Sequence, residues 1–409
     1  MKIAIVSNSN GGGGAGLAAE RHKEALVAAG LDCRLFVLDA VQGTVNTVGP
    51  ASKFEMGGNM LRSQLDYNIA RLFGYRPRSF YSSGRFASGA LHRRVLAFQP
   101  DVIHLHWVSG GAWKPKWVGA SSVPVVWSLH DLWPVTGGCH YPGACECFKT
   151  TCGRCPELGS NFRWDFSWIG QRRKTGGYGR RKITFVGLSE WIGAQAQASR
   201  IGRDHHVVHL PNPIDTELYK PMDRRVARDI LGIPHDRKIL LFGAIGASSD
   251  PRKGAALLRE ALAGLTGSDC ECVVIGNTRP ELGFDASVKV RGLGVIRDRY
   301  SMVLAYNAAD VVVVPSLQEN LSNVIMESLS CGTPVVGFRV GGNIDMIEDG
   351  WNGAIAERIS GESLRDAINR TLHAPNLGQF GVNARTRVVS DYSLAVIGKK
   401  YEQLYKSIQ

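Results

Sequence analysis

Short runs of apolar residues alternate with longer amphipathic segments along nearly the whole chain. In the first half, the runs that read as buried strands are KIAIVSN, CRLFVLD, DVIHLHWV, VPVVWSLHD and ITFVGLS. In the second half they are KILLFGAIG, CECVVIG, VKVRGL, DVVVVPS and TPVVGFRV. Helical patterns lie between them, for example over residues 17–30, 255–265 and 300–309. Strands that alternate with helices predict parallel sheets covered by helices on both faces.

The length of 409 residues exceeds one ordinary core and predicts two domains. The stretch HLPNPIDTELYKP, residues 209–221, is rich in turn-forming residues and marks the join. We therefore predict two doubly wound, Rossmann-like α/β domains, over residues 1–205 and 206–390. Ligands of such sheets bind beyond the carboxyl ends of the strands, so we expect the site in a cleft between two facing sheets.

The composition is that of a soluble globular protein, with 44% hydrophobic and 21% charged residues. The net charge of +12 favours anionic partners such as phosphates, nucleic acid or an acidic membrane face. The opening MKIAIVSNSN has too short an apolar run for a signal peptide, and no run is long enough to span a bilayer. We expect a cytoplasmic protein, and no nucleic-acid partner because no recognised module is present.

Two glutamates in the stretch VVPSLQENLSNVIMESLSCGTPVV are candidates for binding a hydroxyl-rich ligand. Glu319 falls in the loop after a valine strand, and Glu327 falls on the helix that begins near Ser322. Ionised carboxylates only accept hydrogen bonds, which suits sugar hydroxyls and a vicinal diol. The free amides at the start of the helix favour a phosphate. Two solvated surface acids are the alternative, which the flanking buried strands make less favoured.

Cations and glycines at other strand ends are consistent with an anionic ligand. Arg252 and Lys253 stand just before a helix and can face a diphosphate, although they could also be surface charges of a turn. Gly13 and Gly14 belong to the glycine run after the first strand, where backbone amides can approach a phosphate closely. A flexible turn and the dinucleotide-binding loop of an NAD-dependent oxidoreductase are the alternatives for this run.

Taken together, these motifs resemble those of retaining GT-B glycosyltransferases of family four. The resemblance rests on the two glutamates eight positions apart and on the glycine loop, LHDLWP, LPNPIDTELYKP, DPRKG and GGNIDMIEDGWNG. The N-terminal half, with HLHWV and GGCHYPGACECFKTTCGRCP, is similar to colanic-acid and other exopolysaccharide biosynthesis glycosyltransferases. The resemblance implies a nucleotide-diphosphate sugar donor, retention at the anomeric carbon and no metal for catalysis. It also implies a C-terminal helix, over residues 391–409, that packs back on the N-terminal domain.

The resemblance also implies roles for individual residues. Glu327 would hold the donor ribose, and Glu319 would contact hydroxyls of the transferred sugar. His130 would contact a sugar hydroxyl from the other domain, whereas a lone histidine is by default structural. The backbone amides near the diphosphate would be those of Gly13, Gly14, Asn320, Leu321 and Ser322. Two departures stand out: Asn-Leu-Ser replaces the more usual Phe-Gly type pair, and Ala244 replaces a frequent arginine. For His104 and His106, acceptor contact and core packing remain equally open.

Five cysteines crowd into GGCHYPGACECFKTTCGRCP. The spacing of Cys152 and Cys155 lets two thiolates share one tetrahedral ion, and Cys139 and Cys145 would complete a structural zinc site. Cys147 is then left over. Disulfides, which suit a cytoplasmic enzyme poorly, and free thiols are the alternatives.

Basic segments in the N-terminal half bear on the acceptor. Arginines punctuate residues 75–94, and a second basic cluster over residues 171–182 follows two tryptophans. This composition suits an enzyme that lies on the anionic inner face of the cytoplasmic membrane, with solvated helix faces as the alternative. The family commonly extends saccharides linked to polyprenyl diphosphate, so we expect a saccharide acceptor of that kind in cell-surface polysaccharide synthesis. The other functions left open are a catalytically silent nucleotide-sugar-binding scaffold and a GT-B sugar epimerase or phosphorylase-like enzyme.

Overall fold

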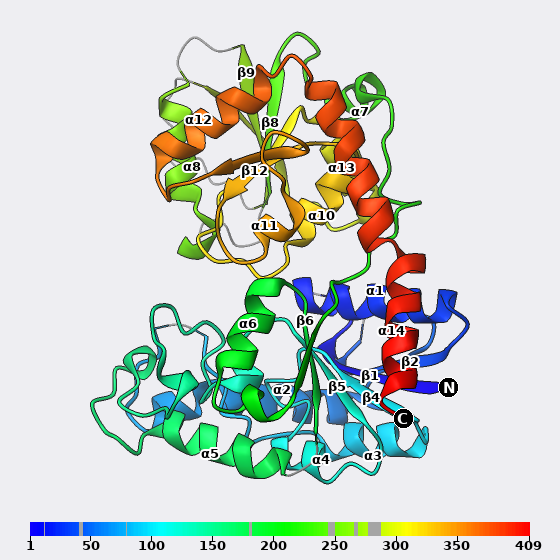
Figure 1. Ribbon diagram of the computed structural model, residues 1–409, viewed down its shortest axis with the longest axis vertical. Helices are drawn as coiled ribbons and strands as arrows, with labels where there is room; N and C mark the ends of the chain where they lie inside the picture. The colour runs from blue at the N-terminus through cyan, green and yellow to red at the C-terminus, as the bar shows by residue number, and fades with distance from the viewer. Residues whose placement is uncertain are drawn as a thin grey trace. The chain divides into compact units, whose positions relative to one another are not determined.

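The structure is a computed structural model that describes the chain except residues 12, 41–43, 79, 180–181, 244–249, 266–268 and 277–287. The chain divides into two compact units (Figure 1). Unit 1 comprises Met1–Pro213 and Leu394–Gln409, and unit 2 comprises Ile214–Ser393. The boundaries thus fall at 213/214 and 393/394, where we predicted 205/206 and 390/391. Ile214 bridges to Ser393, so the chain enters and leaves unit 2 at one place.

Unit 1 is built on a seven-stranded parallel sheet with the order β3-β2-β1-β4-β5-β6-β7. Its strands are β1 (Lys2–Ser9), β2 (Asp32–Asp39), β3 (Thr47–Val48), β4 (Val102–Leu105), β5 (Val125–Leu129), β6 (Thr184–Gly187) and β7 (His206–His209). The five apolar runs predicted for this half all form strands. The two strands that no run predicted, β3 and β7, are at the edges of the sheet, where partial exposure removes the need for a continuous apolar run.

Helices cover both faces of this sheet because alternate side chains of each strand point to opposite faces. Ala4 and Val6 pack on one face, and Ile3 and Ile5 pack on the other. The first face is covered by α3 (Gly89–Ala97), α4 (Pro115–Gly119), α5 (Phe166–Tyr178) and α6 (Glu190–Ala198). The second face is covered by α1 (Gly14–Ala28) and α14 (Leu394–Ser407), which lie side by side (Figure 1). The last helix therefore packs on the N-terminal unit. A further helix, α2 (Lys53–Leu72), follows β3.

Unit 2 is built on a six-stranded parallel sheet with the order β10-β9-β8-β11-β12-β13. Its strands are β8 (Lys238–Gly243), β9 (Cys270–Ile275), β10 (Lys289–Gly294), β11 (Val311–Val314), β12 (Val335–Phe338) and β13 (Gly353–Ala356). Its helices are α7 (Arg224–Leu231), α8 (Ala255–Ala263), α9 (Arg299–Ala308), α10 (Asn323–Ser330), α11 (Asn343–Met346), α12 (Gly361–Leu372) and α13 (Leu377–Tyr392). Two doubly wound parallel sheets confirm the predicted fold class.

The strand order of each sheet reverses at one point, and such a switch point opens a crevice at the carboxyl ends of the strands. In unit 1 the reversal lies between β1 and β4, and in unit 2 it lies between β8 and β11. The loops after these four strands carry or adjoin most of the residues that the sequence singled out.

Candidate donor site

The loop between β11 and α10 in unit 2 buries most of the predicted donor-binding segment. Asn320, Leu321 and Ser322 are each less than one tenth exposed. Ser322 is the N-cap of α10, and its hydroxyl accepts a hydrogen bond from the Ile325 amide at 3.5 Å. The predicted start of this helix is therefore found at the expected residue, with its first amides at the switch point.

Glu319 and Lys253 are brought together from different loops. Lys253 Nζ lies 3.0 Å from Glu319 Oε2, and both side chains are partly exposed. The two loops dock through their backbones, since the Leu317 amide donates to the Arg252 carbonyl at 2.7 Å. Gly254 makes this approach sterically feasible: it has a φ of +70°, and a Cβ there would lie 1.8 Å from the Pro315 carbonyl oxygen. The pair places a cation and a carboxylate side by side at the edge where a diphosphate sugar would enter.

Arg252 points to a different partner. Its guanidinium makes a bidentate interaction with Asp250, with Nε 3.0 Å from Oδ1 and Nη2 2.8 Å from Oδ2. Burial works against the Asp250 carboxylate, but this interaction with Arg252 holds the pKa of Asp250 below its ordinary value. Arg252 therefore pairs within its own loop, while Lys253 contacts the Glu319 carboxylate of the neighbouring loop. Ala244, the predicted departure from the family pattern, lies outside the described residues.

The backbone of Glu319 is fixed from its other side by the GGN sequence after β12. Gly341 has a φ of +50°, and a Cβ there would lie 1.7 Å from the Glu319 carbonyl oxygen. The Gly342 amide donates to the same carbonyl at 3.2 Å. Asn343 anchors this turn because its buried side chain donates to the Phe338 carbonyl at 3.1 Å. The GGN part of the motif GGNIDMIEDGWNG thus fixes the backbone of Glu319.

Glu327 lies on α10 with only 5% of its surface exposed. Its Oε2 accepts a hydrogen bond from the Tyr306 hydroxyl at 2.7 Å. Burial first, and then the Glu327 carboxylate, raise the pKa of Tyr306 well above its ordinary value, so the hydroxyl remains a donor. The sequence did not reveal Tyr306, because a tyrosine on the apolar face of a helix reads as core.

The glycine run of unit 1 connects β1 to α1. Gly13 is the N-cap of α1, and Gly14 is its first residue. Nothing lies within 4 Å of a Cβ built on Gly13, so there is open space beside this residue. Gly16 is the packed member of the run, since a Cβ there would lie 2.8 Å from the Gly11 carbonyl oxygen. The run therefore combines Gly16, which close packing requires, with Gly13, beside which a ligand has room.

His130 follows β5 directly and is partly buried. Its Nε2 lies 2.9 Å from Nδ1 of His106, which is itself fully buried. Burial lowers the pKa of His130 to about 4, although Asp131 acts in the opposite direction, so the ring is neutral at pH 7. The sequence left acceptor contact and core packing open for His104 and His106. Both are buried in the core of unit 1, which favours core packing.

Asp131 organises the aromatic side chains around this strand end. Its carboxylate accepts hydrogen bonds from Trp107 Nε1 at 2.7 Å and from the Trp133 amide at 2.8 Å, and it pairs with His140 at 2.6 Å. Burial opposes ionisation, but His140 and these N–H donors hold the pKa of Asp131 below its ordinary value. The LHDLWP motif is thus a hydrogen-bonded turn that fixes the backbone next to His130.

The cysteine-rich loop gathers its thiols in and beside the core of unit 1. Cys139, Cys152 and Cys155 are buried, Cys145 is half-buried, and Cys147 is exposed. Burial, and then the neighbouring thiols of Cys155 and Cys152, raise the pKa of Cys139 well above its ordinary value. Burial likewise raises the pKa of Cys152 to about 12 and that of Cys145 to about 11, with contributions from nearby cysteines. Thiolates here would need a cation to stabilise them.

Lys174 provides one buried cation beside these thiols. Its ammonium donates to the carbonyls of Trp133 and Thr136 and lies 4.0 Å from the centroid of the Trp133 ring. Burial lowers the pKa of Lys174 to about 7, against the attraction of Cys139 and Cys152. Within the described residues no three cysteine Sγ atoms lie within 4.8 Å of one another, whereas His22, His104 and His106 bring three ring nitrogens that close. The zinc site therefore stays a prediction.

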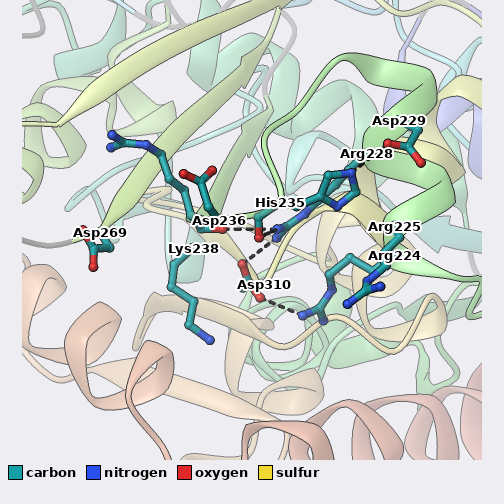
Figure 2. Close-up of a pocket in the computed structure, with 10 residues that line it drawn as sticks. Arg224, Arg225, Arg228, Asp229, His235, Asp236, Lys238, Asp269 and Asp310 are labelled. Carbon is teal, nitrogen blue, oxygen red and sulfur yellow. Dashed lines mark hydrogen bonds and ion pairs between the residues drawn. The ribbon is translucent and has the colours of Figure 1, made fainter.

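A cavity of about 700 Å³ in unit 2 lies at the amino ends of β8, β9 and β11. Figure 2 shows the charged side chains that line it. Part of its charged lining is an ion-pair network centred on Asp310. This carboxylate accepts hydrogen bonds from Arg224 at 2.7 Å, from Arg228 at 2.8 Å and from the Ile239 amide at 2.7 Å. Because ligands of doubly wound sheets bind at the carboxyl ends of the strands, we assign this cavity a structural role.

Some arginines of the predicted basic segments contact other side chains of unit 1. Arg94 makes a bidentate ion pair with Glu55, and the Arg172 guanidinium lies 4.8 Å from the centroid of the Trp168 ring. Arg180 and Arg181 lie outside the described residues. None of the helices in the described part of the chain is both long and apolar enough to cross a bilayer.

Comparison with known protein families agrees with this arrangement. The chain matches the family model described as Glycosyltransferase Family 4 over residues 12–218, which is about half of its length. It also matches the model described as Glycosyl transferases group 1 over residues 236–374. The chain therefore belongs to glycosyltransferase family 4.

Curated relatives are similar at a moderate level. D-inositol 3-phosphate glycosyltransferase 2 of Catenulispora acidiphila is 29% identical over 73% of this chain and 69% of its own length. The D-inositol 3-phosphate glycosyltransferase of Mycolicibacterium smegmatis is 28% identical over 70% of this chain and 63% of its own length. The alpha-D-kanosaminyltransferase of Streptomyces kanamyceticus is 30% identical over 53% of this chain and 56% of its own length.

Solved structures share the fold over the full chain. Sucrose-phosphate synthase of Thermosynechococcus elongatus has a TM-score of 0.68 and 19% identity, with 99% of this chain and 98% of that chain covered. Anabaena HepE in complex with UDP and glucose has a TM-score of 0.66 and 18% identity, with 100% of both chains covered. At these identities the likeness establishes the GT-B fold and nothing finer.

Proposed function

We propose that the protein is a retaining glycosyltransferase that moves a sugar from a nucleotide-diphosphate sugar to a saccharide acceptor. The observation that carries this proposal is the convergence of Lys253 and Glu319 at the switch point of unit 2, where the helix that follows, α10, carries the buried carboxylate of Glu327. A cation, a sugar-binding carboxylate and a diol-binding carboxylate are the groups that a nucleotide-diphosphate sugar requires. Membership of glycosyltransferase family 4 supports the same reaction class.

In this proposal Glu327 accepts hydrogen bonds from the ribose diol, and the amides around Asn320, Leu321 and Ser322 bind the diphosphate and the sugar. Lys253 stabilises the negative charge that develops on the leaving diphosphate, and no divalent metal is needed for that purpose. Arg252 adds positive charge nearby, although the structure holds it on Asp250.

From unit 1, the amides of Gly13 and Gly14 approach the donor, and His130 contacts a hydroxyl of the transferred sugar. With Glu319 on the diphosphate side of the sugar, the favoured route is substitution on the front face. The departing phosphate oxygen then accepts the proton of the incoming hydroxyl, so the anomeric configuration is retained.

The favoured acceptor is a lipid-linked saccharide at the inner face of the cytoplasmic membrane. The net charge of +12 and the apolar side chains that α2 exposes support contact with anionic lipid. This would place the protein in cell-surface polysaccharide synthesis, near the colanic-acid enzymes that its N-terminal half resembles. A small phosphorylated cyclitol is the second candidate acceptor, favoured by the activity for which the relatives from Catenulispora acidiphila and Mycolicibacterium smegmatis are named.

We also infer a structural zinc ion on Cys139, Cys145, Cys152 and Cys155. Four thiols in one loop, three of them buried, match the ligand set of a closed tetrahedral zinc site. The buried ammonium of Lys174 would offset part of the negative charge of a tetrathiolate site. Such an ion would hold the loop and would take no part in the reaction.

The test is to incubate the purified protein with a panel of nucleotide sugars, beginning with UDP-glucose because HepE was solved with it. The acceptor arms are lipid-linked saccharides, inositol phosphate and no acceptor. We expect release of nucleoside diphosphate that an acceptor accelerates, and a product whose NMR spectrum shows the anomeric configuration of the donor. The opposite anomer would exclude retention. Absence of release would favour a silent scaffold, and an isomerised donor without transfer would favour an epimerase.

A further inference from the structure

A continuous chain of hydrogen bonds runs from His130 into the core of unit 1. His130 Nε2 lies 2.9 Å from His106 Nδ1, and His106 Nε2 lies 2.9 Å from His22 Nδ1. His22 comes from α1, and its Nε2 lies 3.2 Å from the hydroxyl of Tyr405. Tyr405 belongs to α14, which lies beside α1 (Figure 1). The histidine at the candidate donor site is thus connected to the last helix of the chain.

The chain continues beyond Tyr405 and ends on a backbone carbonyl. The Tyr405 hydroxyl lies 2.6 Å from His104 Nδ1, and His104 Nε2 lies 2.9 Å from Ser128 Oγ. Ser128 Oγ lies 3.5 Å from the Tyr401 hydroxyl, which donates to the Leu210 carbonyl at 3.4 Å. Every group between His130 and this carbonyl can both donate and accept a hydrogen bond.

The inner rings of the chain are neutral. His22, His104 and His106 are at most 1% exposed. Burial lowers the pKa of His22 to about 3 and lowers those of His104 and His106 well below their ordinary value. A neutral imidazole has one N–H and one lone pair, so the direction of one hydrogen bond fixes the direction of the next.

The carbonyl at the end sets that direction, because it can only accept. The Tyr401 hydroxyl donates its only proton to the Leu210 carbonyl. The Ser128 hydroxyl must therefore donate to the Tyr401 oxygen. His104 Nε2–H then donates to Ser128, and the Tyr405 hydroxyl donates to His104 Nδ1.

The remaining rings take their direction from Tyr405 in the same way. The Tyr405 oxygen accepts from His22 Nε2–H, His22 Nδ1 accepts from His106 Nε2–H, and His106 Nδ1 accepts from His130 Nε2–H. Each of the four rings therefore carries its proton on Nε2.

We propose that this buried chain fixes His130 as the tautomer with its proton on Nε2 and its lone pair on Nδ1, and that Tyr405 is the positioning residue that maintains this choice. Any ligand group that meets Nδ1 of His130 must then be a hydrogen-bond donor. The consequence for the reaction rests on the proposed function. The hydroxyl of the transferred sugar would donate to His130. A donor whose sugar is deoxygenated or O-methylated at that position would therefore be a poor substrate.

A metal ion on the three inner histidines is the rival interpretation. Their ring nitrogens lie within 4.8 Å of one another, which is close enough to consider one ion. The distance of 2.9 Å between His22 Nδ1 and His106 Nε2 is that of an N–H···N hydrogen bond, with one proton between the two atoms. The hydrogen-bonded chain also accounts for both nitrogens of His22, His104 and His106, so we favour it.

The test uses Tyr405→Phe, which removes only the hydroxyl, in protein labelled with ¹⁵N-histidine. Ring nitrogens that carry a proton and those with a lone pair resonate far apart in ¹⁵N NMR, so the spectrum reports each tautomer without any need for activity. We expect His130 of the wild type to be protonated on Nε2. In the variant the inner rings lose their fixed direction, and we expect His130 to show both tautomers.

The matched control is Tyr178→Phe. Tyr178 is fully buried in the same unit, and its hydroxyl donates to the Pro134 carbonyl at 2.8 Å, apart from the chain. This variant should keep the wild-type spectrum. If Tyr405→Phe does not fold, Tyr401→Phe removes the link to Leu210 and should give the same mixture of tautomers. If transferase activity is present, Tyr405→Phe should lower kcat about tenfold with a smaller change in KM, and Tyr178→Phe should change neither.

Three results would overturn the proposal. The first is a wild-type His130 protonated on Nδ1. The second is a His130 tautomer that neither Tyr405→Phe nor Tyr401→Phe changes. The third is a stoichiometric metal ion that Cys152→Ser with Cys155→Ser leaves in place, because that ion would belong to the histidines. An inactive protein with the expected spectra would count against the proposed function alone and leave the histidine chain supported.

Discussion

Glu327 is a carboxylate that the fold buries and supplies with a partner before any ligand arrives. Its side chain is on α10 with 5% exposure, and one oxygen accepts from the Tyr306 hydroxyl. A buried ionised group is costly unless its hydrogen-bonding capacity is used. A carboxylate has about four acceptor positions, so Glu327 can accept hydrogen bonds from a diol in addition to that from Tyr306.

Replacement of Glu327 tests its assignment to the donor. Glu327→Ala removes an ionised acceptor, and a hydrogen bond to a charged group contributes about 1.5–3 kcal/mol, so donor affinity should fall about 10- to 100-fold. Titration calorimetry with the nucleotide sugar that binds the wild type best is the measurement. Tyr306→Phe is the control, since it removes the partner and leaves the carboxylate, and it should weaken binding less. Unchanged affinity in a folded Glu327→Ala protein would remove Glu327 from the site.

The neighbouring cations Lys253 and Arg252 offer a second matched comparison. Lys253 lies 3.0 Å from Glu319, whereas Arg252 is held by Asp250. A preorganised group that stabilises developing charge contributes about 100- to 1000-fold to kcat, so Lys253→Ala should lower kcat by at least about 100-fold. Arg252→Ala should have a clearly smaller effect on turnover. Equal losses in the two variants would mean that net positive charge matters and that the specific position of Lys253 does not.

At the scale of elements, the site depends on two loops whose backbones touch. Gly254 ends the loop that carries Lys253, and it packs against the Pro315 carbonyl after β11. Gly341 approaches the Glu319 carbonyl from the loop after β12 in the same manner. Both glycines adopt a positive φ, which L-residues with side chains adopt at a cost of about 1–2 kcal/mol. The motifs DPRKG and GGN therefore hold the loops of the candidate site against each other.

Gly254→Ala should separate these two loops. The left-handed backbone costs about 1–2 kcal/mol, and the clash with the Pro315 carbonyl adds to it, so the midpoint of thermal unfolding and donor affinity should both fall. Gly232→Ala is the control: its φ is +63°, but no atom lies within 4 Å of the added Cβ. It should lower stability by the backbone cost alone and leave donor affinity intact. Equal effects of the two substitutions on affinity would contradict the docking argument.

The cysteine loop carries its own prediction. The protein as purified should contain about one zinc ion per chain, and Cys152→Ser together with Cys155→Ser should release it and lower thermal stability. Elemental analysis checks the metal content, and Cys147→Ser, at the exposed thiol outside the proposed ligand set, should retain the ion. A chelator should strip zinc slowly without an immediate loss of turnover. Purified protein without bound metal would exclude the site.

The sequence predicted the strands well because buried parallel strands are continuous apolar runs. It also predicted the start of α10 at Ser322 and pointed to Lys253 and Glu319, although their ion pair depends on tertiary contacts. Tyr306, His22 and Tyr405 could not be found in the same way. Each lies on a helix whose pattern reads as packing, and their roles depend on hydrogen bonds between residues as far apart as 22 and 405.

At the scale of the whole molecule, the net charge and the exposed apolar surface are the features that favour a lipid-linked acceptor. The chain has a net charge of +12, and α2 of unit 1 exposes Phe54, Leu61 and Leu72 by 93, 62 and 71%. Their spacings of seven and eleven residues place them on one face of the helix. Basic residues of the same helix, Lys53 and Arg71, are also exposed. An apolar helix face bordered by cations is typical of helices that lie in the interface of an anionic bilayer.

We therefore expect the protein to sediment with vesicles that contain phosphatidylglycerol and much less with pure phosphatidylcholine. Added salt should weaken the association, because each basic residue near the surface contributes about 1 kcal/mol that ions screen. Leu61→Asp should weaken it at least about tenfold, since a side chain of this size contributes about 1.5–3 kcal/mol on burial. Ile230→Asp makes a similar change at a residue of unit 2 with 60% exposure, and it should have little effect. If both variants bind like the wild type, α2 does not contact lipid. If instead Leu61→Asp converts a dimer to a monomer, the face of α2 binds a second copy of the chain.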